Sequence, residues 1–150
     1  MRRKFVRLLL FSGLTDKTGK VSYIKPEYKH SKLTGAILGC AFEVYNELGM
    51  GFPEKIYQRS LELEFKNAGL SIDREYTIPV YFKGVLVGKR RLDFVVNKKV
   101  VVEIKARPYL HDADFIQLRN YLKMAKLEIG LLMNFGSTSV QYRRCIQSIN

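Results

Sequence analysis

The sequence predicts an α+β domain built on a mixed β-sheet, and the periodicity of its apolar residues is the main observation behind that prediction. Two segments in the first half of the chain repeat apolar residues every three or four positions, as amphipathic helices do, and the period then changes to two, as in strands. A third helical segment interrupts the strands, which gives the order helix, helix, three strands, helix, two strands. At 150 residues the chain can bury the core of one such domain.

Glycine and proline residues bound the first two helices. The apolar stripe over residues 33–48 predicts a helix that stops at Gly49. Pro53 can open the second helix, because the first helical position needs no backbone N–H, and the apolar stripe over residues 57–68 ends at Gly69.

Alternation of apolar and polar residues begins at Arg74 and predicts a strand that reaches residue 82. Because proline cannot donate a hydrogen bond to a ladder, Pro79 favours the edge of the sheet for this strand. Lys83 and Gly84 are expected to turn the chain into the next strand. The remaining expected elements are strands at residues 85–96, 100–106, 129–135 and about 140–146, and a helix from about 112 to 126.

The register of the hairpin over residues 85–106 follows from its apolar residues. With residues 97–99 as the loop, the pairs on one wholly apolar face are Val96 with Val100, Phe94 with Val102 and Leu92 with Ile104. A slip of one residue would mix charged side chains into that face, so the hydrophobic pattern selects this register.

The opposite face of the same hairpin brings two acids together. Asp93 is expected directly across from Glu103, with Cβ atoms roughly 4.5–5.5 Å apart, where like charges are destabilising. A divalent cation bridging the two carboxylates is the simplest explanation, because hard cations take oxygen ligands. Lys105 lies on the same face, two residues beyond Glu103. The alternative is an ordinary solvated ion cluster, in which Arg91 and Lys105 neutralise the acids.

The net charge of +12 points to an anionic partner, which would relieve the self-repulsion of so basic a chain. Nucleic acid is the first candidate and an anionic membrane the second, and a basic chain with no polyanionic partner is the third reading. We expect no membrane partner, since no apolar stretch approaches the roughly 18–20 residues that span a bilayer. The basic residues expected to contact phosphates are Lys89, Arg90, Arg91, Lys98 and Lys99.

Two cysteines far apart in sequence do not form a disulfide framework, which suits a reducing, cytoplasmic location. Cys40 falls on the apolar stripe of the first helix and is expected in the core. The first eleven residues imitate a signal peptide, but Arg7 interrupts the apolar run and no cleavage site follows. We therefore expect residues 1–31 to be a loosely structured extension in front of a domain at 32–150, with secretion as the alternative.

Asp93 followed by Glu103 and Lys105 resembles the D…(D/E)-x-K signature of the PD-(D/E)XK nuclease superfamily. Residues 51–57 match the G-x-x-E-x-x-Y motif of the GxxExxY protein family, which is placed in that superfamily. The resemblance covers about residues 33–146. It departs from the signature in one place, since leucine rather than proline directly precedes Asp93.

Two further segments strengthen the resemblance. Gln117 and Tyr121 resemble the Q-x-x-x-Y motif of the RecB and lambda-exonuclease branch. Residues 130–136 look like the closing strand of the GxxExxY family. The fold that the resemblance implies is a restriction-endonuclease-like αβββαβ core, in which helices flank the mixed sheet.

The resemblance also implies a role for each matching residue. Asp93 and Glu103, with Glu54 as an extra carboxylate, would hold Mg²⁺ or Mn²⁺. Lys105 would orient or deprotonate the attacking water and offset charge on the phosphate. Gln117 and Tyr121 would steady the site or touch the scissile phosphate. The simpler readings are a helix-dipole acid for Glu54, a core residue for Tyr57, and an ordinary polar helix face for Gln117 and Tyr121.

These observations predict a Mg²⁺-dependent nuclease that hydrolyses phosphodiester bonds, with DNA favoured over RNA. One rival is a nucleic-acid-binding or scaffold protein that uses the same fold without cutting. The presence of Asp93, Glu103 and Lys105 together argues against it, because a protein that does not cut has no need of all three. A second rival is an enzyme that acts on a small phosphorylated or nucleotide substrate.

Overall fold

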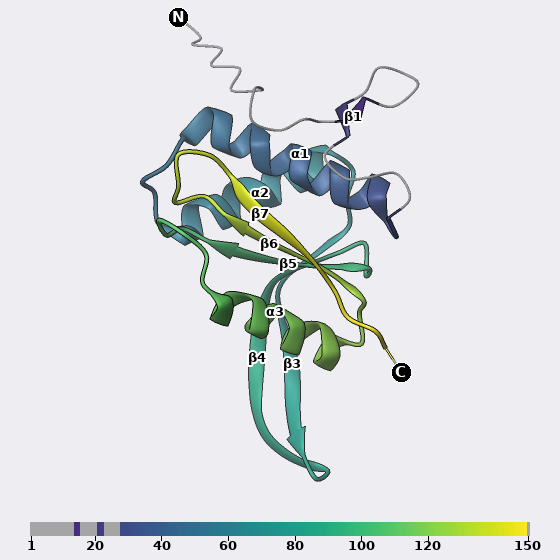
Figure 1. Ribbon diagram of the computed structural model, residues 1–150. Helices are drawn as coiled ribbons and strands as arrows, with labels where there is room; N and C mark the ends of the chain where they lie inside the picture. Colours follow the sequence, from purple (N-terminus) through teal and green to yellow (C-terminus); the bar gives the residue numbers. More distant parts are fainter. Residues whose placement is uncertain (1–13, 16–20, 23–27, 150) are drawn as a thin grey trace, which may run out of the picture.

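The computed structural model describes residues 14–15, 21–22 and 28–149 of the chain. A five-stranded sheet forms the middle layer, with α1 (Ser31–Leu48) and α2 (Glu54–Asn67) on one face and α3 (Asp112–Ala125) on the other (Figure 1). The strand order is β3 (Ile72–Phe82), β4 (Val85–Val96), β5 (Val100–Lys105), β6 (Ile129–Asn134) and β7 (Gln141–Ile146). The predicted α+β fold with a mixed sheet is confirmed.

Strand direction follows from the lengths of the connections. Neighbouring strands joined by short connections run antiparallel, whereas β5 and β6 are parallel because α3 carries the chain back between them. β3 lies at one edge of the sheet, as Pro79 predicts. The expected elements agree with the structure to within one or two residues at their ends. Pro53 is the N-cap of α2 rather than its first helical residue.

The N-terminal segment contains one short feature within the described residues. β1 (Leu14–Thr15) pairs antiparallel with β2 (Val21–Ser22). Most of the expected loosely structured extension over residues 1–31 lies outside the described residues, so that expectation stays a prediction. Among the helices that the structure describes, none combines the length and apolarity needed to cross a membrane.

Two hydrophobic cores lie on opposite faces of the sheet. The larger one joins α1 and α2 to the sheet, and Cys40 is buried in it as predicted. The smaller one lies under α3 and contains Leu92. The prediction that Leu92 shares a face with Phe94 and pairs with Ile104 is therefore wrong.

The reason for this error is that β4 stops pairing with β5 partway along its length and loses its strict alternation of side chains there. The ladder between β4 and β5 includes the predicted pairs up to Phe94 with Val102 and then ends. On the other side, β3 is irregular, because Glu75 has a left-handed φ of 53° and is skipped in the pairing with β4. Strict alternation along β4 is lost at this point, and Leu92 turns toward α3.

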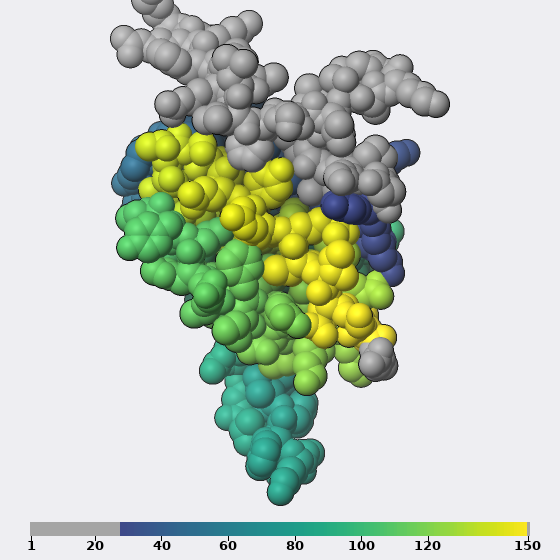
Figure 2. Space-filling view, viewed as in Figure 1, coloured from purple at the N-terminus to yellow at the C-terminus, as the bar shows by residue number. Residues whose placement is uncertain are grey.

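Beyond this point β3 and β4 leave the sheet as a projecting hairpin. We call residues 79–91 the β3–β4 arm. The hairpin extends past α3 and away from the body of the molecule (Figures 1 and 2). Its two strands pair with each other along their length, with one register shift between Val80 and Tyr81.

Candidate active site

Asp93 and Glu103 meet at the fork where β4 and β5 separate. The backbone N–H of Asp93 donates to Glu103 Oε1 at 3.0 Å, and the N–H of Ile104 donates to Asp93 Oδ2 at 2.8 Å. Each carboxylate thus accepts a backbone N–H of the opposite strand, in place of the ladder bonds that would have followed. The structure brings together the two acids that the hairpin register predicts to be neighbours.

Burial raises the pKa of both acids. Glu103 is 5% exposed, and its pKa rises to about 8, first because of burial and then because of the charge on Asp93. Burial also raises the pKa of Asp93, although the N–H of Ile104 acts in the opposite direction. Like-charge repulsion is therefore the second cause of the raised pKa of Glu103, and burial is the larger one.

No salt bridge within the described residues reaches the carboxylate of Asp93 or Glu103, although the charge of Lys105 lowers the pKa of both and the charge of Arg91 lowers that of Asp93. Lys105 instead donates from Nζ to Gln117 Oε1 at 3.1 Å, and Nζ lies 3.8 Å from Asp114 Oδ1. Lys105 and Arg91, the cations of the alternative ion cluster, thus act on the acids at a distance, without a direct ion pair.

Glu54 approaches the pair from the first residue of α2. It lines a cleft of about 250 Å³ together with Asp93 and Arg91. Glu54 is exposed as a residue, but its carboxyl group is partly shielded from water. This shielding raises its pKa, and the charge on Asp93 raises it further. Across the described part of the chain, no three His, Cys, Asp or Glu side chains are gathered as a preformed metal site. Glu54 therefore stands near the pair without completing a ligand set.

Residues 51–57, the G-x-x-E-x-x-Y segment, fix the position of Glu54. Gly51 adopts a φ of 103°, which favours glycine, as the chain turns from α1 into α2. Tyr57 is fully buried, donates from its hydroxyl to the Gly49 carbonyl at 2.7 Å, and stacks on Phe135 at 4.7 Å. Tyr57 is a core residue, as its place in the apolar stripe indicates, and it also anchors the loop before Glu54.

Gln58 is a site residue that the sequence analysis missed. Its Nε2 donates to Asp93 Oδ1 at 3.2 Å, and its side chain is buried. It follows Glu54 by four residues, so both lie on one face of α2. That spacing is the signal that could have revealed it.

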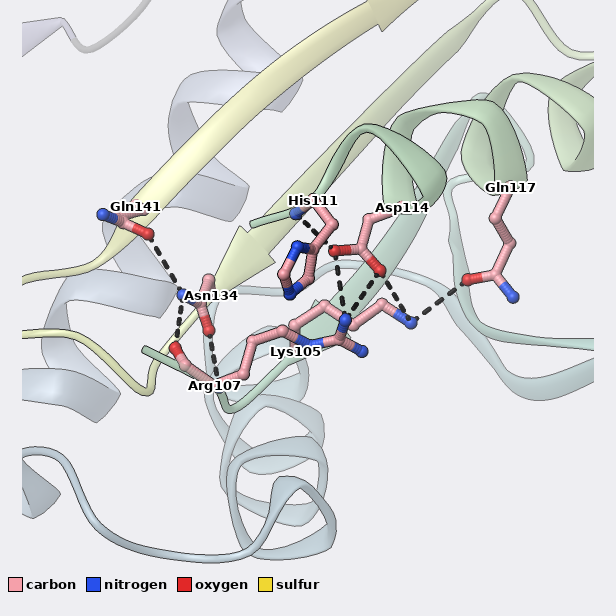
Figure 3. A network of polar contacts seen from close by, with 7 residues as sticks. All are labelled: Lys105, Arg107, His111, Asp114, Gln117, Asn134 and Gln141. Atoms are coloured by element: carbon pink, nitrogen blue, oxygen red, sulfur yellow. Dashed lines mark hydrogen bonds and ion pairs between the residues drawn. The ribbon is translucent and has the colours of Figure 1, made fainter. Parts of the chain in front are cut away.

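Asp114 holds the two basic side chains that follow Glu103 along the chain (Figure 3). It is 6% exposed, and its Oδ1 lies 3.8 Å from Lys105 Nζ and 3.3 Å from Arg107 Nη1. Its Oδ2 also accepts the backbone N–H of His111 at 2.9 Å. Asp114 was missed as well, although it precedes Gln117 by three residues on α3 and so shares its face.

Asn134 fixes the backbone that leaves β5 (Figure 3). Its Oδ1 accepts the N–H of Arg107 at 3.0 Å, and its Nδ2 donates to the Arg107 carbonyl at 2.8 Å. Gly136 permits this contact, because a Cβ there would lie 2.2 Å from the Arg107 backbone nitrogen. The 130–136 segment therefore holds the chain two residues after Lys105.

Gln117 and Tyr121 occupy the face of α3 that looks toward the acids. Gln117 accepts the hydrogen bond from Lys105. Tyr121 is 6% exposed, and its pKa is raised by burial first and then by the charge on Glu103. Tyr121 thus belongs to the core beneath α3 rather than to an ordinary polar helix face.

The predicted phosphate-binding residues divide into two groups. Lys89, Arg90 and Arg91 are exposed on the β3–β4 arm, beside the fork. Lys98 and Lys99 lie in the turn before β5, whereas Lys105 lies at the far end of that strand. At about 3.3 Å per residue, that turn is on the order of 20 Å from Lys105. Of these five residues, Arg91 lines the cleft that contains Asp93 and Glu54.

The donor set is compatible with a divalent metal. Hard cations prefer carboxylate oxygens, and Asp93 and Glu103 present such oxygens with no cation paired to them. Glu54 can add a third carboxylate from the neighbouring cleft.

The comparisons with known proteins identify the family of the chain. The family model of the PD-(D/E)XK nuclease superfamily matches residues 31–145, which is more than half of the chain. The chain therefore belongs to the PD-(D/E)XK nuclease superfamily. Members of this superfamily are generally nucleases, and they typically use divalent metals.

A solved structure is similar in fold. The crystal structure of SSO0001 aligns with a TM-score of 0.51 and 21% sequence identity, over 64% of this chain and 50% of that chain. The alignment spans half of the length of SSO0001, and at this identity it shows the fold alone. No curated protein matches the chain.

Proposed function

We propose that the protein is a metal-dependent nuclease of the GxxExxY type, which hydrolyses phosphodiester bonds in nucleic acid and favours DNA over RNA. The observation that carries the proposal is the pair of adjacent carboxylates at the strand fork, one of them 5% exposed and neither paired with a cation. Leaving two such acids together is unfavourable for the fold. A site for positive charge explains why the chain keeps them.

Asp93 and Glu103 would hold Mg²⁺ or Mn²⁺, with Glu54 as the third carboxylate. When bound, the metal supplies Lewis acidity and lowers the pKa of coordinated water. Lys105 is held by Gln117 and Asp114 at the same fork, where its charge would stabilise the developing charge on the phosphate. Lys105 would also orient the attacking water, and Tyr121 would steady the site from α3.

The cellular location that fits this proposal is the cytoplasm. Cys40 and Cys145 are both free thiols, and burial raises the pKa of the Cys40 thiol to about 11. Unpaired cysteines suit a reducing compartment.

The test is an incubation of the purified protein with single- and double-stranded DNA and RNA, with Mg²⁺, with Mn²⁺ and with EDTA. We expect cleavage only when metal is present, and loss of cleavage in Glu103→Gln and Lys105→Ala. Glu43→Gln is a matched control, because Glu43 is exposed on α1. If both site variants cut like the wild type, the site lies elsewhere. Metal-independent binding without any cleavage would instead support a binding or scaffold protein on the same fold.

A further inference from the structure

We infer that the β3–β4 arm and the exposed face of α3 form a channel for a single nucleic-acid strand, and that the tip of the arm stacks on its bases. This inference rests on the proposed nuclease function and specifies the form of its substrate. It is carried by the exposure of the arm, by its charge, and by a cleft between the arm and α3 whose wall includes Gln117, the hydrogen-bond partner of Lys105.

The tip of the arm carries large, mostly exposed apolar side chains, and Lys83 Nζ lies 5.5 Å from the centroid of the Phe82 ring. Tyr81 is 62% exposed and Phe82 is 63% exposed. Val85, Leu86 and Val87 are each at least 50% exposed beside them. A contiguous exposed apolar patch of this kind marks an interaction site. The space-filling view shows that the tip stands clear of the body (Figure 2).

The charge of the arm selects an anionic occupant. Residues 79–91 contain no acid, whereas they contain the four cations Lys83, Lys89, Arg90 and Arg91. Two arms brought together would therefore repel each other, which disfavours a second copy of the chain as the occupant. Aromatic side chains among basic ones match a nucleic-acid strand, whose phosphates attract the cations and whose bases stack on the rings.

A cleft of about 660 Å³ lies between the arm and α3. Val80 and Arg90 line it from the arm, and Gln117 and Lys123 line it from the helix. No acidic residue lines this cleft. Apolar groups for base faces and cations for phosphates thus occur in the same walls.

The cleft borders the candidate active site at Gln117. Gln117 forms part of its wall and also accepts the hydrogen bond from Lys105. On the arm, Arg90 lines this cleft, and the adjacent Arg91 lines the cleft that contains Glu54 and Asp93. A strand lying along the arm would therefore enter the fork between β4 and β5, where Asp93 stands.

A single strand fits this channel better than a duplex does. Bases in a duplex are stacked on one another, so an aromatic side chain reaches their faces only when the strand is open. The expected substrate is therefore a single-stranded region, such as a free strand, a flap or an overhang.

Binding of fluorescent oligo-dT and of a duplex of equal length, measured by anisotropy in EDTA, tests the inference without cleavage. Phe82→Ala and Phe82→Leu should weaken single-strand binding roughly 5- to 100-fold, and Phe82→Tyr should bind like the wild type. The leucine variant retains apolar surface and loses only the ring, so it separates stacking from hydrophobic docking. Phe82 is exposed, so all three variants should fold.

The helix side of the channel has its own matched pair of variants. Lys123→Ala removes a cation from the cleft wall, and Lys32→Ala removes an exposed lysine from α1 on the other face of the sheet. Lys123→Ala should make the slope of log affinity against log salt less steep by about 0.7, the value for one phosphate contact on a single strand. Lys32→Ala should leave the slope unchanged.

Several outcomes would overturn the inference. One is equal binding of single strands by the wild type and Phe82→Ala. Another is a wild type that binds the duplex more tightly than oligo-dT, when neither Phe82→Ala nor Lys123→Ala changes that preference. A third is a wild-type dimer that Phe82→Ala converts to a monomer without loss of oligonucleotide binding, since the arm would then be a protein interface. If the arm variants lose binding but no protein cuts with Mg²⁺ or Mn²⁺, the channel stands and the nuclease proposal fails.

Discussion

The backbone N–H of Asp93 is hydrogen-bonded to Glu103 Oε1 at 3.0 Å, immediately beyond the last pair of the β4–β5 ladder. A side chain rather than a carbonyl therefore holds the two strands together at this point. Any change in the charge of Glu103, through a proton or a cation, acts directly on the fork between the strands. The stability of the fold and the chemistry of the site are linked through these two residues.

Asp93→Asn should distinguish the destabilising effect of the paired acids on the fold from their role in metal binding and cleavage. The variant deletes one charge, and its carbonyl oxygen can still accept the N–H of Ile104, while Gln58 can turn its amide to accept from the new Nδ2. We expect it to melt at or above the wild-type temperature in EDTA at pH 7.5, to gain little from Mn²⁺ and to have no cleavage activity. The wild type should melt higher when metal is added.

The contrary result for this variant is equally informative. A wild type whose melting temperature ignores millimolar Mn²⁺, together with a variant that melts well below it, would make Asp93 part of a structural polar network. Differential scanning fluorimetry of both proteins, with and without metal, gives the answer.

The raised pKa of Glu103 predicts how the stability of the metal-free protein depends on pH. Its pKa of about 8 in the folded chain lies above the ordinary carboxyl value of about 4.3, so the native state holds the proton more tightly. The stabilisation is complete below about pH 4.3 and is lost as pH rises toward 8. Urea unfolding in EDTA at pH 5.5 and pH 8 should show this loss in the wild type.

Glu103→Gln is the control for that measurement, because glutamine has no proton to lose in this range. The decrease in the free energy of unfolding between pH 5.5 and pH 8 should be smaller in this variant than in the wild type. Equal decreases in both proteins would assign the pH dependence to other groups. In the wild type, Mn²⁺ should bind more tightly at pH 8, since metal binding releases the proton.

Asp114→Asn should impair cleavage more than it impairs folding. Asparagine keeps an acceptor for the His111 N–H but removes the charge that faces Lys105 and Arg107. Cleavage should fall about 10- to 100-fold, as is usual when a residue that orients a metal site is changed. Asp112→Asn is the matched control, because Asp112 is an exposed acid in the same helical turn. A cleavage rate equal to that of the wild type would remove Asp114 from the site.

Tyr57→Phe should weaken the loop that positions Glu54. The change removes the hydroxyl that donates to the Gly49 carbonyl, at a cost of about 1 kcal/mol in the free energy of unfolding. Because Glu54 starts the helix that follows this loop, metal affinity should fall as well. Tyr76→Phe provides the comparison, since Tyr76 is 43% exposed. Titration with Mn²⁺ and urea unfolding measure the two effects, and unchanged metal affinity would limit Tyr57 to a core role.

The meeting of Asp93 and Glu103 could be predicted from sequence because it depends on local features. A strand period of two and a three-residue loop fix the register of a hairpin, whatever surrounds it. The position of Leu92 could not be predicted in the same way. It depends on the left-handed backbone at Glu75 in β3, which breaks the alternation opposite Asp93.

The residues that support the site also differ in whether local sequence could predict their positions. Gln58 and Asp114 each stand at helical spacing from a residue that the sequence analysis had named, so their positions follow from the helix period. The contact of Asn134 with Arg107 joins the end of β6 to the segment after β5. Only the folded arrangement of parallel strands brings those segments together.

The β3–β4 arm should also unfold locally more readily than the rest of the molecule. Its hydrogen bonds beyond Leu92 join only its own two strands, and its tip is exposed to water, so it can open without disturbing either core. Amide protons of residues 80–91 should exchange with solvent long before those of β5 and β6. A strand bound along the arm would slow that exchange, so the rate of deuterium uptake there reports occupancy of the channel without any label.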